Sequence, residues 1–305
     1  MIDRSPWLSR RTLLSGVGAA ALAGCGKPKA EQSAPAVPVP VADGPPEGSL
    51  EWAVAGPWRA SDRVRDRFRH PVQTLKFFGL GEDQAVVELW PGAGYYTEIV
   101  APFLARNRGR YYAAQFAVTE DADPAMAQTV ARFKEHFGKD RTLYGDIRFT
   151  QFPPAGDRAS APPAGADLVL MMNNFHNWMG AGMAEIAMHE AFAALKPGGV
   201  LGVEQHRKPM SELSDIQDPA ATDGYVQEAY VKQMAAEAGF VFKAASEINA
   251  NPKDTHDHPF GVWTLPPNRL SAPRGEPDNP NFNHAKYDLI GESDRMTLKF
   301  RKPDS

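Results

Sequence analysis

Apolar and polar positions alternate along the chain from about residue 50 in a pattern that predicts strands and helices in turn. Short apolar runs of strand length lie at residues 86–89, 111–116, 147–152, 166–172 and 200–204. Between these runs, apolar residues recur at helical spacing, as Ile99, Val100 and Phe103 do. Strands that alternate with helices indicate an α/β fold in which right-handed crossovers join parallel strands.

The carboxyl-terminal part of the pattern predicts a helix over residues 225–238 and a terminal pair of strands at residues 240–244 and 296–301. A polar insertion, residues 249–293, separates the two strands. Its length of about 45 residues is far beyond that of an ordinary connection, so the insertion is either disordered or functional. The apolar residues within it that favour a lid over a pocket are Phe260, Val262, Trp263 and Leu265.

The first predicted strand runs directly into a glycine turn. Glu88 lies near the end of this apolar strand, Gly92 and Gly94 follow it, and a helix begins near Tyr95. An acidic residue at the end of a buried strand, followed by glycines that let the backbone approach a ligand, is typical of a nucleotide-type site at the first βα turn of a doubly wound sheet. The alternative is a turn that only joins a strand to a helix.

The amino terminus has the pattern of an export signal. Residues 9–14 read Ser-Arg-Arg-Thr-Leu-Leu, a weakly apolar run follows over residues 13–23, and residues 22–25 read Leu-Ala-Gly-Cys. The apolar run is shorter than the roughly 20 residues of a membrane-spanning helix. We therefore expect a twin-arginine signal peptide over residues 1–24 and a lipid on Cys25 that anchors the protein to the periplasmic face of a membrane in the cell envelope.

The composition of the residues after the signal sets the expected domain boundaries. Residues 25–49 are rich in proline and alanine without a helical or strand period, which predicts an extended tether. A single folded domain is expected over residues 50–305, with the insertion inside it. Cys25 is the only cysteine in the 305 residues, so neither an intramolecular disulfide nor a thiol nucleophile is available to the folded domain.

Charge and composition narrow the function classes. The formal net charge is −4, which gives no electrostatic case for a nucleic-acid partner. The arginines of residues 61–69 are expected on a solvated face. The acidic and histidine residues within 254–258 are close in sequence, but without helical spacing or a known ligand motif we expect a solvated loop and no metal site. These residues are Asp254, His256, Asp257 and His258.

With these elements in place, the chain resembles class I S-adenosylmethionine-dependent methyltransferases. Residues 86–94 match the family's first motif, residues 166–172 its fourth strand, and residues 195–201 the turn before its fifth strand. A closer resemblance is to a group of exported bacterial proteins described as predicted methyltransferases, through Arg69-His70-Pro71 and the Trp-Pro-Gly-Ala-Gly-Tyr-Tyr-Thr-Glu run. The resemblance implies a Rossmann-like doubly wound sheet of about seven strands with the last strand antiparallel.

The resemblance also implies where S-adenosylmethionine would bind. The glycines would admit the methionine part of this cofactor, Glu88 would hold its ammonium group, and the helix near Tyr95 would direct its positive end at the carboxylate. Gln115 stands where the family has an acidic ribose ligand, and Trp90 stands where it has a glycine, so the indole is expected to narrow the site. The implied cofactor-binding residues are Glu88, Gly92, Gly94, Tyr95, Gln115 and Asn173.

The substrate side is expected at the carboxyl end of the fourth strand, where ligands collect in open α/β sheets. His176 is the first candidate for a general base, and His206, at the end of the fifth strand, is the second. The alternative for His176 is a core or capping histidine bonded to backbone. The residues expected to orient the substrate or to wall its pocket are Asn173, Asn174, Asn177 and Trp178.

Export raises a difficulty, since S-adenosylmethionine is a cytoplasmic metabolite. Two functions therefore stay open. One is an exported, lipid-anchored methyltransferase that acts on an unidentified small molecule. The other is a lipoprotein that keeps the methyltransferase fold and binds a ligand without catalysis.

Overall fold

The computed structural model describes residues 44–119, 122–154, 159–209 and 216–304. Cys25, the expected signal peptide and most of the expected tether lie outside the described residues. Among the residues described, no helix has the length and apolar character that crossing a membrane requires. The folded part begins at α1, Leu50–Ala55, where the side chain of Ser49 accepts a hydrogen bond from the backbone N–H of Trp52.

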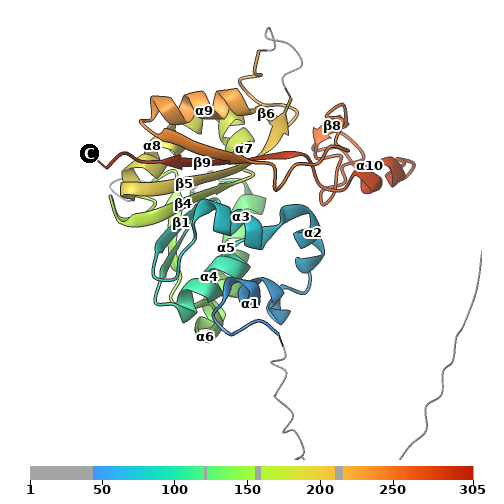
Figure 1. Ribbon diagram of the computed structural model, residues 1–305. Coiled ribbons are helices and arrows are strands. Elements are labelled where there is room, and N and C mark those ends of the chain that lie inside the picture. The colour runs from blue at the N-terminus through green and yellow to red at the C-terminus, as the bar shows by residue number, and fades with distance from the viewer. Residues whose placement is uncertain (1–43, 120–121, 155–158, 210–215, 305) are drawn as a thin grey trace, which may run out of the picture. The chain divides into compact units, whose positions relative to one another are not determined.

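A mostly parallel sheet forms the centre of the domain (Figure 1). Its strands are β1 (Ala85–Leu89), β2 (Arg110–Phe116), β3 (Arg148–Phe152), β4 (Ala166–Met172), β5 (Leu195–Lys208), β7 (Val241–Ser246) and β9 (Arg295–Arg301). Their order across the sheet is β3-β2-β1-β4-β5-β9-β7, and a short strand, β6 (Val226–Gln227), pairs with the end of β5. Only β9 runs against its neighbours. The predicted class I methyltransferase fold, with its antiparallel last strand, is confirmed by this order.

Helices cover both faces of the sheet because successive strand residues point to opposite faces. On β1, Val87 and Leu89 pack into one buried cluster, and Val86 into the other. One face carries α7 (Phe175–Gly180), α8 (Ala184–Ala194) and α9 (Glu228–Glu237). The other face carries α1, α3 (Pro71–Phe78), α4 (Thr97–Arg106), α5 (Pro124–Lys139) and α6 (Arg141–Tyr144).

The strand order places the candidate chemistry at one edge. The chain leaves β1 toward β2 on one side, while β4 lies on its other side, so the carboxyl ends of β1 and β4 form a topological switch point. Because β9 is antiparallel, its first residue, Arg295, lies at the same edge and pairs in register with His206. Residues from the start of the last strand therefore join those from the ends of the parallel strands.

The segment before α3 is more structured than a solvated face. It contains two short 3-10 turns, Pro57–Arg59 and Arg63–Arg65, and α2, Asp66–Arg69. His70, at φ 40°, ends α2, and Pro71 opens α3. The expectation that the arginines of residues 61–69 lie on a solvated face is wrong for Arg69, whose side chain is 12% exposed and pairs with Glu292 at 2.7 Å. Arg59, just before this segment, is also buried and pairs with Asp66 at 2.8 Å.

Two expectations for the carboxyl-terminal part need correction. Residues 225–227 are not helical, since β6 occupies two of them and α9 begins at Glu228. The loop around Asp254 is not solvated: Asp254 and His258 are buried, and the Asp254 Oδ1 to His258 Nε2 distance is 2.7 Å. Asp254 also accepts hydrogen bonds from the Tyr225 hydroxyl and the Asp294 backbone. The insertion is thus held against the sheet edge, with β8 (Pro259–Val262) and α10 (Ala285–Ile290) inside it.

Candidate active site

The glycine turn after β1 forms the wall of a cavity of about 390 Å³, which we call the turn cavity. Its volume falls within the range of small-molecule pockets, roughly 300–1,000 Å³. The residues that line it are Asp62, Arg65, Arg69, Glu88, Trp90, Pro91, Gly92, Ala93, Gly94, Tyr95, Tyr96, Met172, Asn174, Pro267 and Asn268. Four of the predicted cofactor-binding residues, Glu88, Gly92, Gly94 and Tyr95, therefore meet at one cavity.

Both glycines have left-handed backbone, with φ 60° at Gly92 and φ 102° at Gly94. Gly94 is also tightly enclosed, because an added Cβ would lie 2.4 Å from the Phe137 ring. An added Cβ at Gly92 would meet no heavy atom within 4 Å. The turn thus needs glycine at 94 for packing as well as conformation, whereas the space beside Gly92 stays open.

Glu88 presents a carboxylate to the turn cavity. Its Oε2 accepts hydrogen bonds from the hydroxyls of Tyr111 and Thr97, and its Oε1 has no protein partner in the described part of the chain. Burial raises the pKa of Glu88 to about 7, although the two hydrogen bonds act to lower it. A buried carboxylate with one free oxygen suits a ligand cation, which would favour its ionised form.

The indole of Trp90 packs into the core on the α7 side, and Trp90 is also among the residues that line the turn cavity. Its Nε1 donates to the Phe152 carbonyl at 2.7 Å, and its ring meets those of Phe116 and Trp178 edge-on, with centroids 4.6 and 5.7 Å away. The expected narrowing of the site by this indole stays a prediction. Trp90 itself adopts φ 55°, and its backbone carbonyl accepts from Asn174 Nδ2 at 2.7 Å.

Gln115 is buried behind the glycine turn. Its Nε2 donates to the Gly92 carbonyl at 2.6 Å, and Gln115 is not among the residues that line the turn cavity. The amide thus braces the turn in this structure. Its predicted contact with a ribose stays a prediction.

A second cavity of about 220 Å³ adjoins the turn cavity and contains both candidate bases; we call it the histidine cavity. Arg65, Arg69, Pro267 and Asn268 line both cavities. The other residues of the histidine cavity are Asn173, His176, Asn177, His206, Val262, Trp263, Leu265, Pro266, Glu292, Ser293 and Arg295. The insertion therefore closes this region with three of the apolar residues that were expected to form a lid.

The two histidine rings lie side by side, with centroids 5.2 Å apart. Nδ1 of His176 contacts the side-chain amide of Gln205, and Nδ1 of His206 lies 2.6 Å from the Ser293 hydroxyl. Burial lowers the pKa of His176 to about 4, and burial, with the nearby charges of Arg295 and Arg69, holds the pKa of His206 well below its usual range. Both imidazoles are consequently neutral at neutral pH.

A third, larger cavity of about 660 Å³ lies on the far side of His176 and is called the outer cavity. His176, Asn177 and Trp263 line both it and the histidine cavity. The remaining walls come from residues 220–223, from the insertion and from the end of α7. His176 therefore stands between a small cavity next to the glycine turn and an open cavity large enough for a second molecule.

Trp178 differs in position from the expected pocket wall, whereas the three asparagines line the cavities. Trp178 is fully buried in the core against Trp90 and Phe152, and it lines none of the three cavities. Nδ2 of Asn174 donates hydrogen bonds to the backbone carbonyls of Trp90 and Met172, which connects the end of β4 to the glycine turn. Asn177 lines two cavities and donates to Asn174 Oδ1 at 3.1 Å.

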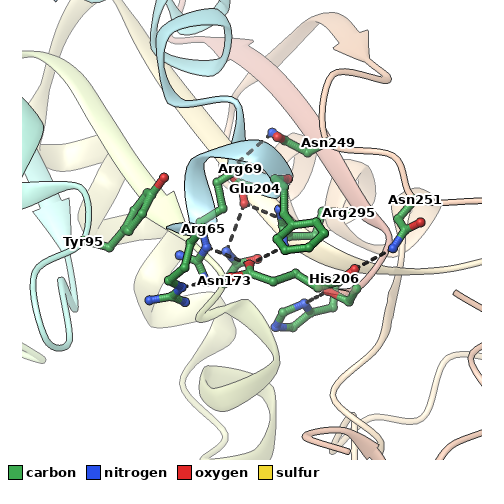
Figure 2. Close-up of polar contacts among 12 residues, drawn as sticks. Arg65, Arg69, Tyr95, Asn173, Glu204, His206, Asn249, Asn251 and Arg295 are labelled. Atoms are coloured by element: carbon green, nitrogen blue, oxygen red, sulfur yellow. Dashed lines mark hydrogen bonds and ion pairs between the residues drawn. The ribbon is translucent and has the colours of Figure 1, made fainter. Parts of the chain in front are cut away.

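A buried cluster of charges lies at the histidine cavity (Figure 2), and several of its members line the cavity. Glu204 accepts hydrogen bonds from Tyr96 Oη at 2.6 Å and Asn173 Nδ2 at 3.0 Å, and its Oε1 lies 2.8 Å from Arg295 Nε. Glu292 pairs with the three arginines of the cluster, Arg65, Arg69 and Arg295, at 2.9, 2.7 and 2.9 Å. Burial opposes ionisation of Glu292, yet the charges of these arginines lower its pKa to about 2.

The cluster contains functional candidates that the sequence reasoning missed. Glu292, Ser293 and Arg295 lie just before or at the start of β9, within the run Gly-Glu-Ser-Asp-Arg. A signal for them was present: an antiparallel last strand brings its first residues to the carboxyl ends of the parallel strands. That consequence of the predicted topology identifies this polar run as part of the site.

Comparison with known proteins adds a likeness of fold only. No protein-family model matches the chain, and no curated protein matches it. Among solved structures, a SAM-dependent methyltransferase from Aquifex aeolicus has 19% identity and a TM-score of 0.47 over 63% of this chain and 90% of that one.

Two further structures are similar at the same level. The 1,6-didemethyltoxoflavin-N1-methyltransferase of Burkholderia thailandensis, solved with S-adenosylhomocysteine, has 13% identity and a TM-score of 0.43 over 82% of this chain and 85% of that one. A possible exported protein from Bordetella parapertussis has 14% identity and a TM-score of 0.43 over 79% and 68%. The strand order and the three cavities, rather than these likenesses, carry the argument that follows.

Proposed function

We propose that this protein is an S-adenosylmethionine-dependent methyltransferase that acts on a small molecule. The observation that carries the proposal is the turn cavity. It lies at the switch point of a class I methyltransferase sheet, and it combines the free carboxylate oxygen of Glu88 with the bare backbone at Gly92. Glu88 would hold the ammonium group of the cofactor, and the turn from Gly92 to Gly94 would lie against its methionine part.

The chemistry follows from the neighbouring cavity. When bound, S-adenosylmethionine supplies a methyl group on a positively charged sulfur. An acceptor would enter from the outer cavity. As its oxygen or nitrogen bonded to the methyl carbon, the carbon–sulfur bond would break, S-adenosylhomocysteine would be left, and the acceptor's proton would pass to an imidazole. His176 is placed for this role because it is neutral, lines both cavities and has no partner at Nε2 in the described residues. The protein otherwise contributes alignment and exclusion of water, which the insertion provides.

We also propose that the domain acts outside the cytoplasm as a lipoprotein. The sequence supports this through the twin-arginine pattern and the Leu-Ala-Gly-Cys run that ends at Cys25. In cells fed a radiolabelled fatty acid, the wild-type chain should carry label and fractionate with membranes. A Cys25→Ser variant should lose both properties, and retention of label would exclude Cys25 as the site.

The enzyme proposal is tested by identifying what the protein carries and binds. Protein purified from the cell envelope is denatured, and the released small molecules are analysed by mass spectrometry. S-Adenosylmethionine or S-adenosylhomocysteine should be found, and calorimetry with added S-adenosylhomocysteine should give a micromolar-range affinity, on the order of −8 kcal/mol. Absence of both ligands together with no heat of binding would refute the proposal.

A second candidate function is ligand binding without methyl transfer. One observation favours it: the strand end that would hold a ribose has the Gln115 amide in place of a carboxylate, and this amide donates to the Gly92 carbonyl. The two functions differ in turnover. With radiolabelled methyl donor and an envelope extract as the acceptor source, the enzyme should transfer label in a His176-dependent manner, whereas a binding protein should not.

A further inference from the structure

Arg69 stands at the junction of the turn cavity and the histidine cavity, and it lines both. Its side chain is 12% exposed. Only its Nε has a protein partner among the described residues, Glu292 at 2.7 Å. The two terminal nitrogens of the guanidinium, which carry four N–H groups, therefore have no protein acceptor in that part of the chain. A largely buried cation with a free fork of donors is expected to meet an acceptor from a ligand.

The fork is held rigidly. The guanidinium carbon of Arg69 lies 4.6 Å from the centroid of the Tyr95 ring, and that of Arg65 lies 5.3 Å from the same centroid. Tyr95 is itself fixed by a 2.6 Å hydrogen bond from its hydroxyl to Asp66. Nε of Arg65 donates to Glu292, and one of its terminal nitrogens donates to Asp62. The other terminal nitrogen of Arg65 has no protein acceptor among the described residues. Figure 2 shows Tyr95 beside the two arginines.

Charge at this place favours an anion over a metal cation. Three guanidiniums, those of Arg65, Arg69 and Arg295, line the histidine cavity, and Glu292 is the only carboxylate among its lining residues. Because the two neighbouring histidines are neutral, the positive charge at this place comes from the arginines alone. A planar fork of donors matches the two oxygens of a carboxylate, which it binds through two parallel hydrogen bonds.

We propose that Arg69, supported by Arg65 and Tyr95, binds the carboxylate of a ligand that spans the junction of the two cavities. This inference rests on the proposed function for its ligand. The carboxylate belongs either to the methionine part of the cofactor or to the methyl acceptor. The first source places the carboxylate on the turn-cavity side and the ammonium at Glu88; the second places it on the side of His176.

The first arm of the test compares S-adenosylmethionine with decarboxylated S-adenosylmethionine, which lacks only the carboxylate. Calorimetry is run on the full chain and on its Arg69→Gln and Arg69→Lys variants. The matched control is Arg67→Gln, because Arg67 lies on the same helix and is exposed. If the cofactor supplies the carboxylate, the wild type should prefer the complete cofactor by about 10- to 100-fold. Arg69→Gln should abolish this preference, Arg69→Lys should keep part of it, and Arg67→Gln all of it.

The second arm uses 4-fluorobenzoate as a carboxylate probe, followed by fluorine NMR, with 4-fluorobenzamide as its neutral counterpart. If the acceptor supplies the carboxylate, the benzoate should bind beside saturating S-adenosylmethionine, need Arg69, and be preferred to the benzamide. The cofactor preference should then be the same in Arg69→Gln as in the wild type. Thermal denaturation checks that the variants fold, which is expected because Glu292 keeps Arg65 and Arg295 as partners.

The proposal is overturned if folded Arg69→Gln changes neither the preference for the complete cofactor nor the binding of 4-fluorobenzoate. Failure of the proposed function looks different. In that case the wild type binds neither form of the cofactor, and the benzoate arm in ligand-free protein alone decides: Arg69-dependent binding supports the carboxylate site, and its absence refutes it.

Discussion

The free carboxylate of Glu88 leads to a prediction about pH and cofactor affinity. In the ligand-free protein, burial raises the pKa of Glu88 to about 7. A bound ammonium group favours the ionised carboxylate, so affinity should be full above pH 7 and fall as the pH drops through 7. Below this pKa, each pH unit costs about 1.4 kcal/mol of binding free energy, or a factor of about ten in Kd. From pH 8 to pH 6, Kd for S-adenosylhomocysteine should rise about tenfold.

Glu98 supplies a matched control for this titration. Its pKa is also raised to about 7 by burial, but Glu98 does not line the turn cavity. Calorimetry at pH 6, 7 and 8, in buffers of different ionisation heat, measures both Kd and the protons released on binding. Glu98→Gln should keep the wild-type pH dependence. Glu88→Gln should weaken binding and make Kd flat across this range.

The reasoning would be refuted if Glu88→Gln bound S-adenosylhomocysteine as tightly as the wild type, or if its Kd still rose tenfold toward pH 6. Stability gives an independent check. A folded-state pKa of about 7 against an ordinary value of 4.5 means that Glu88 lowers the free energy of unfolding as pH rises through this window, by about 3 kcal/mol at pH 8. Glu88→Gln should therefore raise Tm at pH 8 and have little effect at pH 4.

Three further predictions concern single side chains. Gly94→Ala should destabilise the fold and abolish cofactor binding, because its Cβ would lie 2.4 Å from the Phe137 ring. The added Cβ of Gly92→Ala meets no neighbouring atom within 4 Å, so this variant should fold. Equal Tm values for the two variants would contradict this reasoning. Because the pKa of His176 is lowered to about 4 from 6.5, the neutral ring does not reduce the free energy of unfolding above pH 6.5, but up to about 3 kcal/mol of it is lost as pH falls toward 4. His176→Gln should therefore reduce the fall in Tm between pH 7 and pH 4.5. An unchanged Tm profile would exclude His176 as the source of that fall. Trp90→Phe should cost about 0.5–1.5 kcal/mol for the lost hydrogen bond to the Phe152 carbonyl, which keeps its bond from the Ala117 backbone N–H, and should leave Kd for S-adenosylhomocysteine unchanged. A weaker Kd would mean that the indole reaches the ligand.

The sheet could be predicted from the sequence because its signals are local. The apolar run before Glu88 and the run over residues 166–172 have strand length, and the glycine turn follows the first of them directly. Ala166–Met172 forms β4 with the predicted bounds. The sequence predicts that the fifth strand ends at residue 204, which is too early. β5 continues to Lys208 through polar residues, which hydrophobic periodicity does not identify as strand.

The side-chain pairing around the site could not be predicted because it joins distant segments. Arg65 and Glu292 are 227 residues apart, and each alone resembles a surface charge. Asp254 and His258 are close in sequence, but their burial depends on Tyr225 and Asp294. Hydrophobic periodicity indicates which face of an element is buried, but it cannot predict which charged side chains are buried together.

The buried charge cluster is better explained by positioning than by stability. Taking several charges out of water costs free energy that their attraction only partly returns, and well-packed apolar residues would hold these elements together at least as well. The cluster does something that apolar residues could not. Glu204 links Tyr96 at the start of α4, Asn173 at the end of β4 and Arg295 at the start of β9, three segments that border the cavities. Directional contacts of this kind fix the Arg69 fork and the two histidines relative to the glycine turn, which is the alignment that the proposed methyl transfer would require.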